Sequence, residues 1–188
     1  MLPDTLERRS VSDITLAGRQ IIGYAVVFDT LSADLGGFRE IITPEAVDRT
    51  LRDRLDVRAL VDHDASKVLG RTTANTLRLA KDTRGLRVEI DPPDTTVGRD
   101  TLALVQRGDV TGMSFSFRVV RPHGERFERR DGRAVRIITD VAIQEISIVT
   151  FPAYEATDVQ VAQRALQLFT GESGGRSVAA LRRQLLAR

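Results

Sequence analysis

Residues 112–117 read Gly-Met-Ser-Phe-Ser-Phe, a stretch in which two hydroxyl groups alternate with large apolar side chains. In a β-strand successive side chains point to opposite faces, so the methionine and the two phenylalanines share one face while Ser114 and Ser116 share the other. The pattern predicts a buried strand with one polar face. Because neighbours on one face are roughly 6.5–7 Å apart along a strand, only one of the two serines can hydrogen-bond to the same partner.

The sequence on both sides of this stretch predicts a mainly β protein. Alternating or compact apolar runs between turn residues indicate strands within 12–28 and at 38–42, 57–62, 69–73, 76–80, 85–91, 113–120 and 133–150. Helices are predicted at 45–55, 95–107 and 155–169, with the charged stretch 125–132 as a connection. The regular strand–helix alternation of a doubly wound sheet does not occur. We therefore expect an α+β fold in which helices flank a closed or nearly closed antiparallel β-barrel.

The length of 188 residues suits one domain with a short appendage. We assign residues 1–170 to this domain, residues 171–176 to a glycine-rich flexible linker, and residues 177–188 to a basic amphipathic helix. From residue 164 onward there are five Arg and one Glu, a net charge of +4, against a formal net charge of +2 for the whole chain. The body is therefore close to neutral, and the basic character belongs to the tail.

Composition excludes several kinds of site. The chain has no cysteine, so disulfides, thiolate metal sites and a cysteine nucleophile are ruled out. Two histidines argue against a zinc site, although carboxylates could still bind a harder ion, and no cofactor is predicted. No apolar run approaches the ~20 residues that cross a bilayer, and the N-terminus lacks the apolar core of a secretion signal. Without a basic stripe interleaved with aromatic residues, we expect no specific nucleic-acid partner.

A histidine and a carboxylate stand out elsewhere in the chain. His63 lies in Val-Asp-His-Asp, and Glu145 lies within the apolar stretch Gln-Glu-Ile-Ser-Ile-Val, where a carboxylate is costly to bury unless it is paired. A serine, a histidine and a carboxylate on separate strands are the parts of a serine hydrolase triad, which is recognised by its geometry. Each residue also has an ordinary interpretation: a structural strand serine, an exposed loop histidine, and a glutamate that faces water from an edge strand.

Three blocks of the sequence resemble those of the prohead (capsid maturation) proteases of tailed phages, in that family's order. They are Val61-Asp62-His63-Asp64 with Val68-Leu69-Gly70-Arg71, then Gly108-Asp109-Val110-Thr111-Gly112-Met113-Ser114-Phe115-Ser116-Phe117, and last Glu145-Ile146-Ser147-Ile148-Val149-Thr150-Phe151-Pro152-Ala153-Tyr154. The resemblance spans roughly residues 14–160 and departs mildly from the family pattern at 115–117 and at Tyr154. It implies a fold shared with herpesvirus assemblins, an antiparallel β-barrel surrounded by helices that carries the serine and the histidine.

The resemblance also implies the roles of the site residues. The chain would be a viral serine endopeptidase with Ser114 as the nucleophile, His63 as the general base and Glu145 as the acid of the triad. The family block selects Ser114 over Ser116. In the acyl-enzyme mechanism of such enzymes, the histidine moves the proton while the acid holds the imidazole in the right tautomer.

Other residues stay open for the acid and for the oxyanion hole. Asp62 and Asp64 flank the histidine and are fallback acids. Herpesvirus enzymes use a second histidine instead, for which His123 is the candidate here, but its Pro-His-Gly turn predicts a surface residue. The oxyanion hole would come from backbone N–H groups or from an arginine such as Arg118 or Arg136.

By the same resemblance, the substrate is the scaffold protein or the scaffolding segment of the major capsid protein. Cleavage would take place inside the procapsid in the host cytoplasm, without a membrane partner, and a homo-oligomer is left open. The tail is interpreted either as a scaffold-docking or autocleavage element or as a helix that packs on its own barrel or on a twin subunit. Two other functions remain as alternatives, a non-enzymatic capsid scaffold or assembly protein with the same barrel and a serine hydrolase acting on small esters.

Overall fold

The computed structural model describes residues 6–12, 14–35, 37–120, 122–151 and 166. Its strands are β1 (Glu7–Ser12), β2 (Ile14–Ala17), β3 (Gln20–Val27), β4 (Phe38–Ile42), β5 (Arg58–Val61), β6 (Asp64–Arg71), β7 (Leu77–Lys81), β8 (Gly85–Ile90), β9 (Gly112–Val119), β10 (Glu125–Arg130), β11 (Arg133–Ile138) and β12 (Val141–Val149). Its helices are the 3₁₀ turns η1 (Pro44–Val47) and η2 (Thr72–Ala74) and the α-helices α1 (Asp48–Arg52) and α2 (Thr96–Arg107). Within the described ranges no helix has the length and hydropathy to span a membrane. The predicted helix at 155–169, apart from Leu166, and the predicted linker and tail helix lie outside the described residues.

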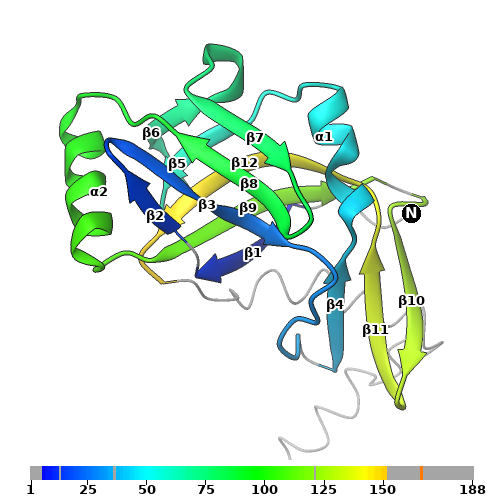
Figure 1. Ribbon diagram of the computed structural model, residues 1–188. Helices are drawn as coiled ribbons and strands as arrows, with labels where there is room; N and C mark the ends of the chain where they lie inside the picture. Colours follow the sequence, from blue (N-terminus) through cyan, green and yellow to red (C-terminus); the bar gives the residue numbers. More distant parts are fainter. Residues whose placement is uncertain (1–5, 13, 36, 121, 152–165, 167–188) are drawn as a thin grey trace, which may run out of the picture.

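The strands form three sheets (Figure 1). The largest has the order β1-β9-β12-β5-β6, the second has the order β2-β3-β8-β7, and the third, β10-β11-β4, projects from one side of the molecule. The prediction of a mainly β, α+β fold is confirmed. The predicted closed antiparallel barrel, the herpesvirus-protease type included, is not found, because the described strands divide among separate sheets. Two of the sheets are also mixed, since β12 pairs in parallel with β5 and β11 pairs in parallel with β4.

The apolar face of the largest sheet forms much of the main core. Met113, Phe115 and Phe117 of β9 are buried together, as their alternation predicts, and they join Ile146 and Ile148 of β12. The two phenylalanine rings stack with their centroids 5.0 Å apart. Burying a side chain of this size contributes about 1.5–3 kcal/mol. This face therefore holds the sheet in place, and the opposite face can carry polar groups.

The two predicted helices that lie in the described ranges differ in how well they match. Helix α2 is confirmed: the Thr95 side chain accepts a hydrogen bond at its N-terminus, and Gly108 ends it with a φ of +79°. The helix predicted at 45–55 is shorter, a 3₁₀ turn followed by α1. It ends early because Arg54 adopts a φ of +49°, in the left-handed region that cannot continue a helix.

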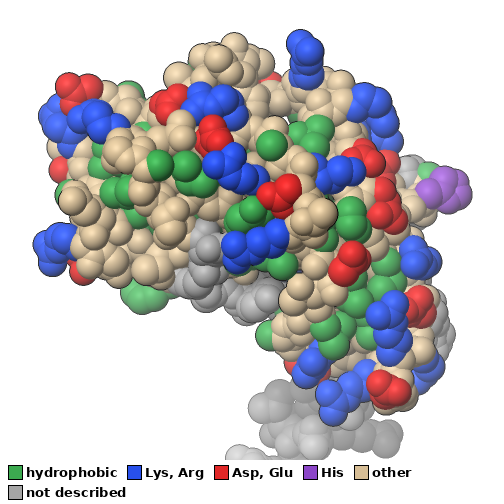
Figure 2. Space-filling model, viewed as in Figure 1, with side chains coloured by type: hydrophobic (Ala, Val, Ile, Leu, Met, Phe, Trp, Pro, Cys, Tyr) green, Lys and Arg blue, Asp and Glu red, His purple; other side chains and the backbone are tan. Residues whose placement is uncertain are grey.

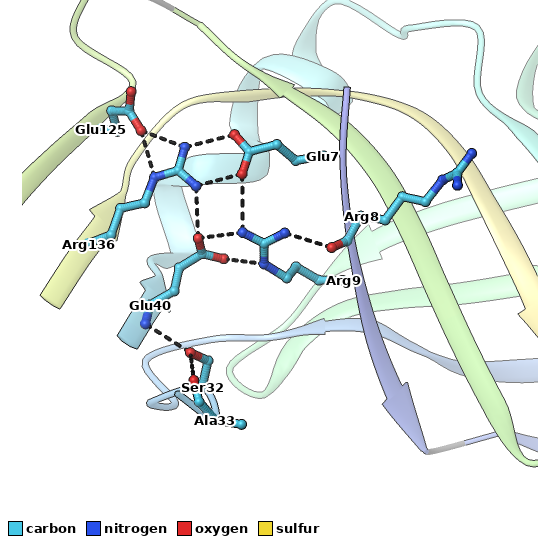
Figure 3. A network of polar contacts seen from close by, with 8 residues as sticks. All are labelled: Glu7, Arg8, Arg9, Ser32, Ala33, Glu40, Glu125 and Arg136. Carbon is cyan, nitrogen blue, oxygen red and sulfur yellow. Dashed lines mark hydrogen bonds and ion pairs between the residues drawn. The ribbon is translucent and has the colours of Figure 1, made fainter. Parts of the chain in front are cut away.

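The sequence does not predict two strands that are rich in charged residues. These strands, β1 and β10, read Glu-Arg-Arg-Ser-Val-Ser and Glu-Arg-Phe-Glu-Arg-Arg. Charged residues are normally a sign of solvated loops. Here some of them face a buried ionic network that joins β1, β4, β10 and β11 (Figure 3). The apolar pattern that reveals a strand is therefore missing from both.

The network consists of two arginines and three glutamates. Arg136 is fully buried and donates hydrogen bonds of 2.6–2.9 Å to Glu7, Glu40 and Glu125. Arg9 donates twice to Glu40 at 2.8 Å and once to Glu7 at 3.1 Å. Burial alone would lower the pKa of Arg136, but the hydrogen bonds and charges of the three glutamates raise it, so the guanidinium stays charged. The network ties the projecting third sheet to the edge strand of the largest sheet.

Candidate active site

The polar face of the largest sheet brings the predicted site residues onto neighbouring strands. In the register of β9 and β12, Ser114 is opposite Ser147, and Ser116 is opposite Glu145. On the other side of β9, the edge strand β1 places Arg8 beside Ser116. Directly opposite residues in an antiparallel pair have Cβ atoms about 4.5–5.5 Å apart, so these side chains are within contact range.

A bulge in β12 explains how a carboxylate fits into an apolar strand. The register shifts between Ile143, which is buried in the core, and Glu145, which is opposite Ser116. The extra residue, Gln144, is exposed. Without the bulge, Glu145 would share the face of Ile143 and point into the core. The bulge turns the carboxylate to the polar face, which satisfies both the apolar pattern of the strand and the need of the charge for partners.

His63 lies in the two-residue turn of the β5–β6 hairpin. Asp62 and His63 have φ angles of +47° and +59°, the combination typical of the type I′ turn in tight hairpins. The turn is fixed to β12, because the Asp62 backbone N–H donates to the Ile148 carbonyl at 2.9 Å. The Asp62 carboxylate in turn accepts hydrogen bonds from the backbone and hydroxyl of Thr150, at 2.8 and 3.1 Å. The strained turn therefore holds the imidazole over the polar face.

Glu145 is the carboxylate that contacts the imidazole. Its Oε1 lies 2.5 Å from His63 Nδ1, and the two side chains are 13% and 14% exposed. Ser147 donates to the other oxygen, Oε2, at 2.6 Å, and its hydroxyl accepts from the His63 backbone N–H at 3.2 Å. Ser116 also donates to Oε1. Burial alone would raise the pKa of Glu145, but the hydrogen bonds from His63, Ser116 and Ser147 lower it below its usual value.

The alternative acids have other partners. The Asp62 carboxylate accepts from Thr150, as described above, and that of Asp64 accepts from the backbone and hydroxyl of Ser66 at 2.9 and 2.6 Å. His123, the alternative third member, is exposed in its turn, as predicted. Of the carboxylates considered from the sequence, Glu145 is thus the one whose contact with the imidazole the structure records.

The second half of the first sequence block, Val68-Leu69-Gly70-Arg71, has a structural role. A Cβ atom at Gly70 would lie 2.6 Å from the backbone carbonyl oxygen of Thr76, closer than atoms tolerate, so only glycine fits. Arg71 forms a two-pronged hydrogen bond with Asp56 at 2.7 and 2.6 Å, which holds the pKa of that carboxyl at about 2. These residues shape the β5–β6 hairpin and take no part in the site.

Ser114 lies in a small pocket beside the histidine. The pocket has a volume of about 130 Å³ and is lined by Arg8, Ser10, Asp62, His63, Ser114, Val149 and Phe151. The Ser114 side chain is 1% exposed, and its Oγ has no hydrogen-bond partner among the described residues. The hydrogen bond expected between Ser114 and His63 is therefore not formed in this structure, although both residues face the same pocket. Ser116, the rival serine, is instead bonded to Glu145.

Arg8 is a pocket residue that the sequence did not reveal. Nothing in the sequence separates it from Arg9, and only the strand register shows that one arginine enters the ionic network while the other faces the pocket. Of the arginines considered for the oxyanion hole, Arg136 is buried in the network and Arg118 is not among the residues that line the pocket. In the described part of the chain, no three acidic or histidine side chains converge in a way that could ligate a metal ion.

On the face of the molecule in Figure 2, Lys and Arg side chains are interspersed with Asp and Glu side chains and do not gather into one basic stripe. Comparison with curated proteins found no match for this chain. The family model of the caudovirus prohead serine proteases matches residues 4–171 of the 188. This span includes the three sequence blocks and every residue of the polar face described above. The chain therefore belongs to the caudovirus prohead serine protease family.

Proposed function

We propose that this family member cuts the scaffold protein, or the scaffolding segment of the major capsid protein, inside the procapsid, with Ser114, His63 and Glu145 as its catalytic triad. Family membership supports a serine protease of capsid maturation and a capsid or scaffold protein as substrate. The named triad and the scaffold cleavage are the specific parts of the proposal.

The main support for this triad is that the two serine hydroxyls differ in their hydrogen bonding. Ser114 Oγ is buried without a partner in the pocket that His63 lines, whereas the Ser116 hydroxyl is engaged by Glu145. A buried hydroxyl without a hydrogen bond costs about 1–3 kcal/mol. Such a cost is expected where an atom must stay available to a substrate.

The contacts support a division of work within the proposed triad. With Nδ1 of His63 held by Glu145, the other ring nitrogen, Nε2, is left to accept the Ser114 proton as the oxygen attacks the scissile carbonyl. Glu145 fixes the tautomer and stabilises the imidazolium that forms. Because the pKa of Glu145 is lowered, the carboxylate is ionised throughout the neutral pH range. The histidine then returns the proton to the leaving amine.

The test is processing of the proposed substrate in cells that co-express this chain with a major capsid protein or scaffold protein of the same phage. Mass spectrometry of the products should show new termini with the wild-type chain, and Ser114→Ala and His63→Ala should each reduce processing by on the order of 10⁴-fold or more. Ser116→Ala is the matched control, since it removes a hydroxyl two residues away on the same face. It should cost far less than Ser114→Ala.

The outcomes distinguish a wrong choice of nucleophile from a wrong class of protein. Should Ser116→Ala be the inactive variant while Ser114→Ala still processes, the nucleophile is misassigned but the enzyme class stands. Full processing by the Ser114→Ala/Ser116→Ala double variant would end the proposal. It would favour the non-enzymatic assembly protein instead.

A further inference from the structure

Arg8 reaches the Ser114 pocket because strand β1 alternates between two polar environments. Its neighbours Glu7 and Arg9 point into the buried ionic network, so Arg8 points to the opposite face, over β9. There its Nε donates to Ser116 Oγ at 3.3 Å, and its side chain lines the same pocket as Ser114.

The network under the strand also fixes the position of Arg8. The Arg9 guanidinium donates to the backbone carbonyl of Arg8 at 2.6 Å (Figure 3). The same guanidinium is bonded to Glu7 and Glu40, and its Cζ lies 5.6 Å from the centroid of the Phe117 ring. The backbone that carries Arg8 is thus held by groups that are themselves buried and paired. A cation on such a support needs little rearrangement to meet a new charge, which is the condition for electrostatic catalysis.

The charges around the pocket show why a cation matters there. Asp62 lines the pocket and Glu145 adjoins it, so the described part of the resting site carries two carboxylates. Attack on a carbonyl places a further negative charge on the substrate oxygen. Among the described residues that line the pocket, Arg8 is the side chain with a permanent positive charge. Its guanidinium can offset the new charge, which the carboxylates would otherwise repel.

We propose that the Arg8 guanidinium binds the oxyanion of the tetrahedral intermediate formed at Ser114, an inference that rests on the proposed function. In this step the Ser114 oxygen bonds to the carbonyl carbon, the π electrons of the carbonyl move to its oxygen, and His63 takes the hydroxyl proton. When the intermediate collapses, the carbonyl re-forms, the carbon–nitrogen bond breaks, and His63 protonates the leaving amine. Arg8 donates hydrogen bonds throughout and exchanges no proton.

The test compares cleavage of two peptide substrates by the full chain and its variants. The peptides span a processing site found by mass spectrometry, one with its natural flanking residues and one with every acidic residue near the cut replaced by its amide. Arg8→Gln should lower kcat by about 10²–10³-fold on both peptides, with KM nearly unchanged, as for loss of an oxyanion-hole donor. Added guanidinium ion should restore part of the activity of Arg8→Ala. The exposed Arg107→Gln on α2 is the matched control and should keep the wild-type rate.

Three results would overturn the inference while leaving the proposed function in place. The first is an active wild-type chain with an equally active Arg8→Gln variant. The second is a rise in KM confined to the acidic peptide, which would make Arg8 a residue of substrate specificity. The third is an equal loss of kcat in Ser116→Ala, which would mean that Arg8 acts only through Ser116 and Glu145. A wild-type chain that neither cleaves nor reacts at Ser114 with a fluorophosphonate would instead overturn the proposed function, and this inference with it.

Discussion

Two polar clusters lie on opposite sides of strand β1, and they differ in whether their buried polar atoms have hydrogen-bond partners. In the ionic network every nitrogen of the Arg9 and Arg136 guanidinium groups donates a hydrogen bond. In the pocket on the other side, Ser114 Oγ is buried with no partner among the described residues. Ser114 is as deeply buried as Arg9 and Arg136, so the difference between these side chains does not come from their exposure. This difference fits the proposed function, in which the fully bonded network stabilises the fold and the unbonded Ser114 hydroxyl is available to a substrate.

Of the variants that test this difference between the clusters, Arg136→Met should have the largest effect, a loss of stability. The change keeps the bulk of the side chain but leaves Glu7, Glu40 and Glu125 without their shared partner in a buried site. Loss of one partner from a buried ion pair typically costs about 3–5 kcal/mol, and urea denaturation should show a loss of that size in the free energy of unfolding. Asp56→Asn, at an exposed ion pair, is the control and should lower the urea midpoint far less. A loss below about 1 kcal/mol for Arg136→Met would mean that the network contributes little to stability.

The next largest effect should be that of Glu145→Gln on activity. An amide keeps the shape of the side chain but removes the charge that stabilises the imidazolium, and its NH₂ group cannot accept the hydroxyl hydrogen bonds that the carboxylate accepts. We expect kcat/KM for peptide cleavage to fall by on the order of 10²–10³-fold, less than for Ser114→Ala. Asp62→Asn should not reproduce this loss, because Asp62 is bonded to Thr150. An equal loss of kcat/KM in both variants would contradict the assignment of Glu145 as the acid of the triad.

A smaller effect of opposite sign is expected for the stability of Ser114→Ala. The variant removes a buried hydroxyl that has no hydrogen bond, so the free energy of unfolding should rise by about 1 kcal/mol while activity is lost. Ser147→Ala is the contrasting change, because its hydroxyl has two partners and its removal should destabilise the fold. Thermal unfolding of the two variants and the wild type shows whether each change raises or lowers stability. Destabilisation by Ser114→Ala would show that its hydroxyl has a partner in solution.

The smallest expected effect is that of low pH on the stability of the fold. Burial alone would raise the pKa of Glu7, but the hydrogen bonds and charges of Arg136 and Arg9 lower it below its usual value of 4.5. A carboxyl with a lowered folded-state pKa contributes stability above its unfolded pKa and loses it as the pH falls toward the folded value. The urea midpoint should therefore be steady above pH 4.5 and decline gradually below it. Glu7→Gln should show a shallower decline, and an unchanged slope would contradict the shift.

Much of the candidate site could be predicted from the sequence, because its residues lie in regions with a clear pattern. The alternation at 112–117 predicts the two serines on one face of β9. His63 is expected in a loop, but the tight β5–β6 hairpin turn that holds it is not predicted. The bulge that turns Glu145 to that face could not be predicted. It depends on pairing with β9. The successive polar residues Gln144 and Glu145 interrupt the alternation of β12, but they do not show which of the two turns toward the site.

The errors in the fold have a related cause. Strands β1 and β10 were missed because their charged residues find partners across sheets, and pairing at such a distance has no local signature. Arg8 was missed with β1. The closed barrel is not found among the described strands. Local patterns predict strands but not which strand edges meet, and the parallel pairing of β5 with β12 departs from an all-antiparallel arrangement.

That parallel pairing also determines when the site can form during the life of the chain. His63 and Glu145 are 82 residues apart in sequence, and they meet only after β12 has been synthesised and has paired with β5. Non-local pairings of this kind are slow steps in folding. If the proposed triad is correct, a nascent chain that ends before β12 contains its serine and histidine but lacks the acid that orients the ring. With that triad the enzyme would be inactive until β12 has paired, and completion of its own fold would be the first control on when it begins to cut.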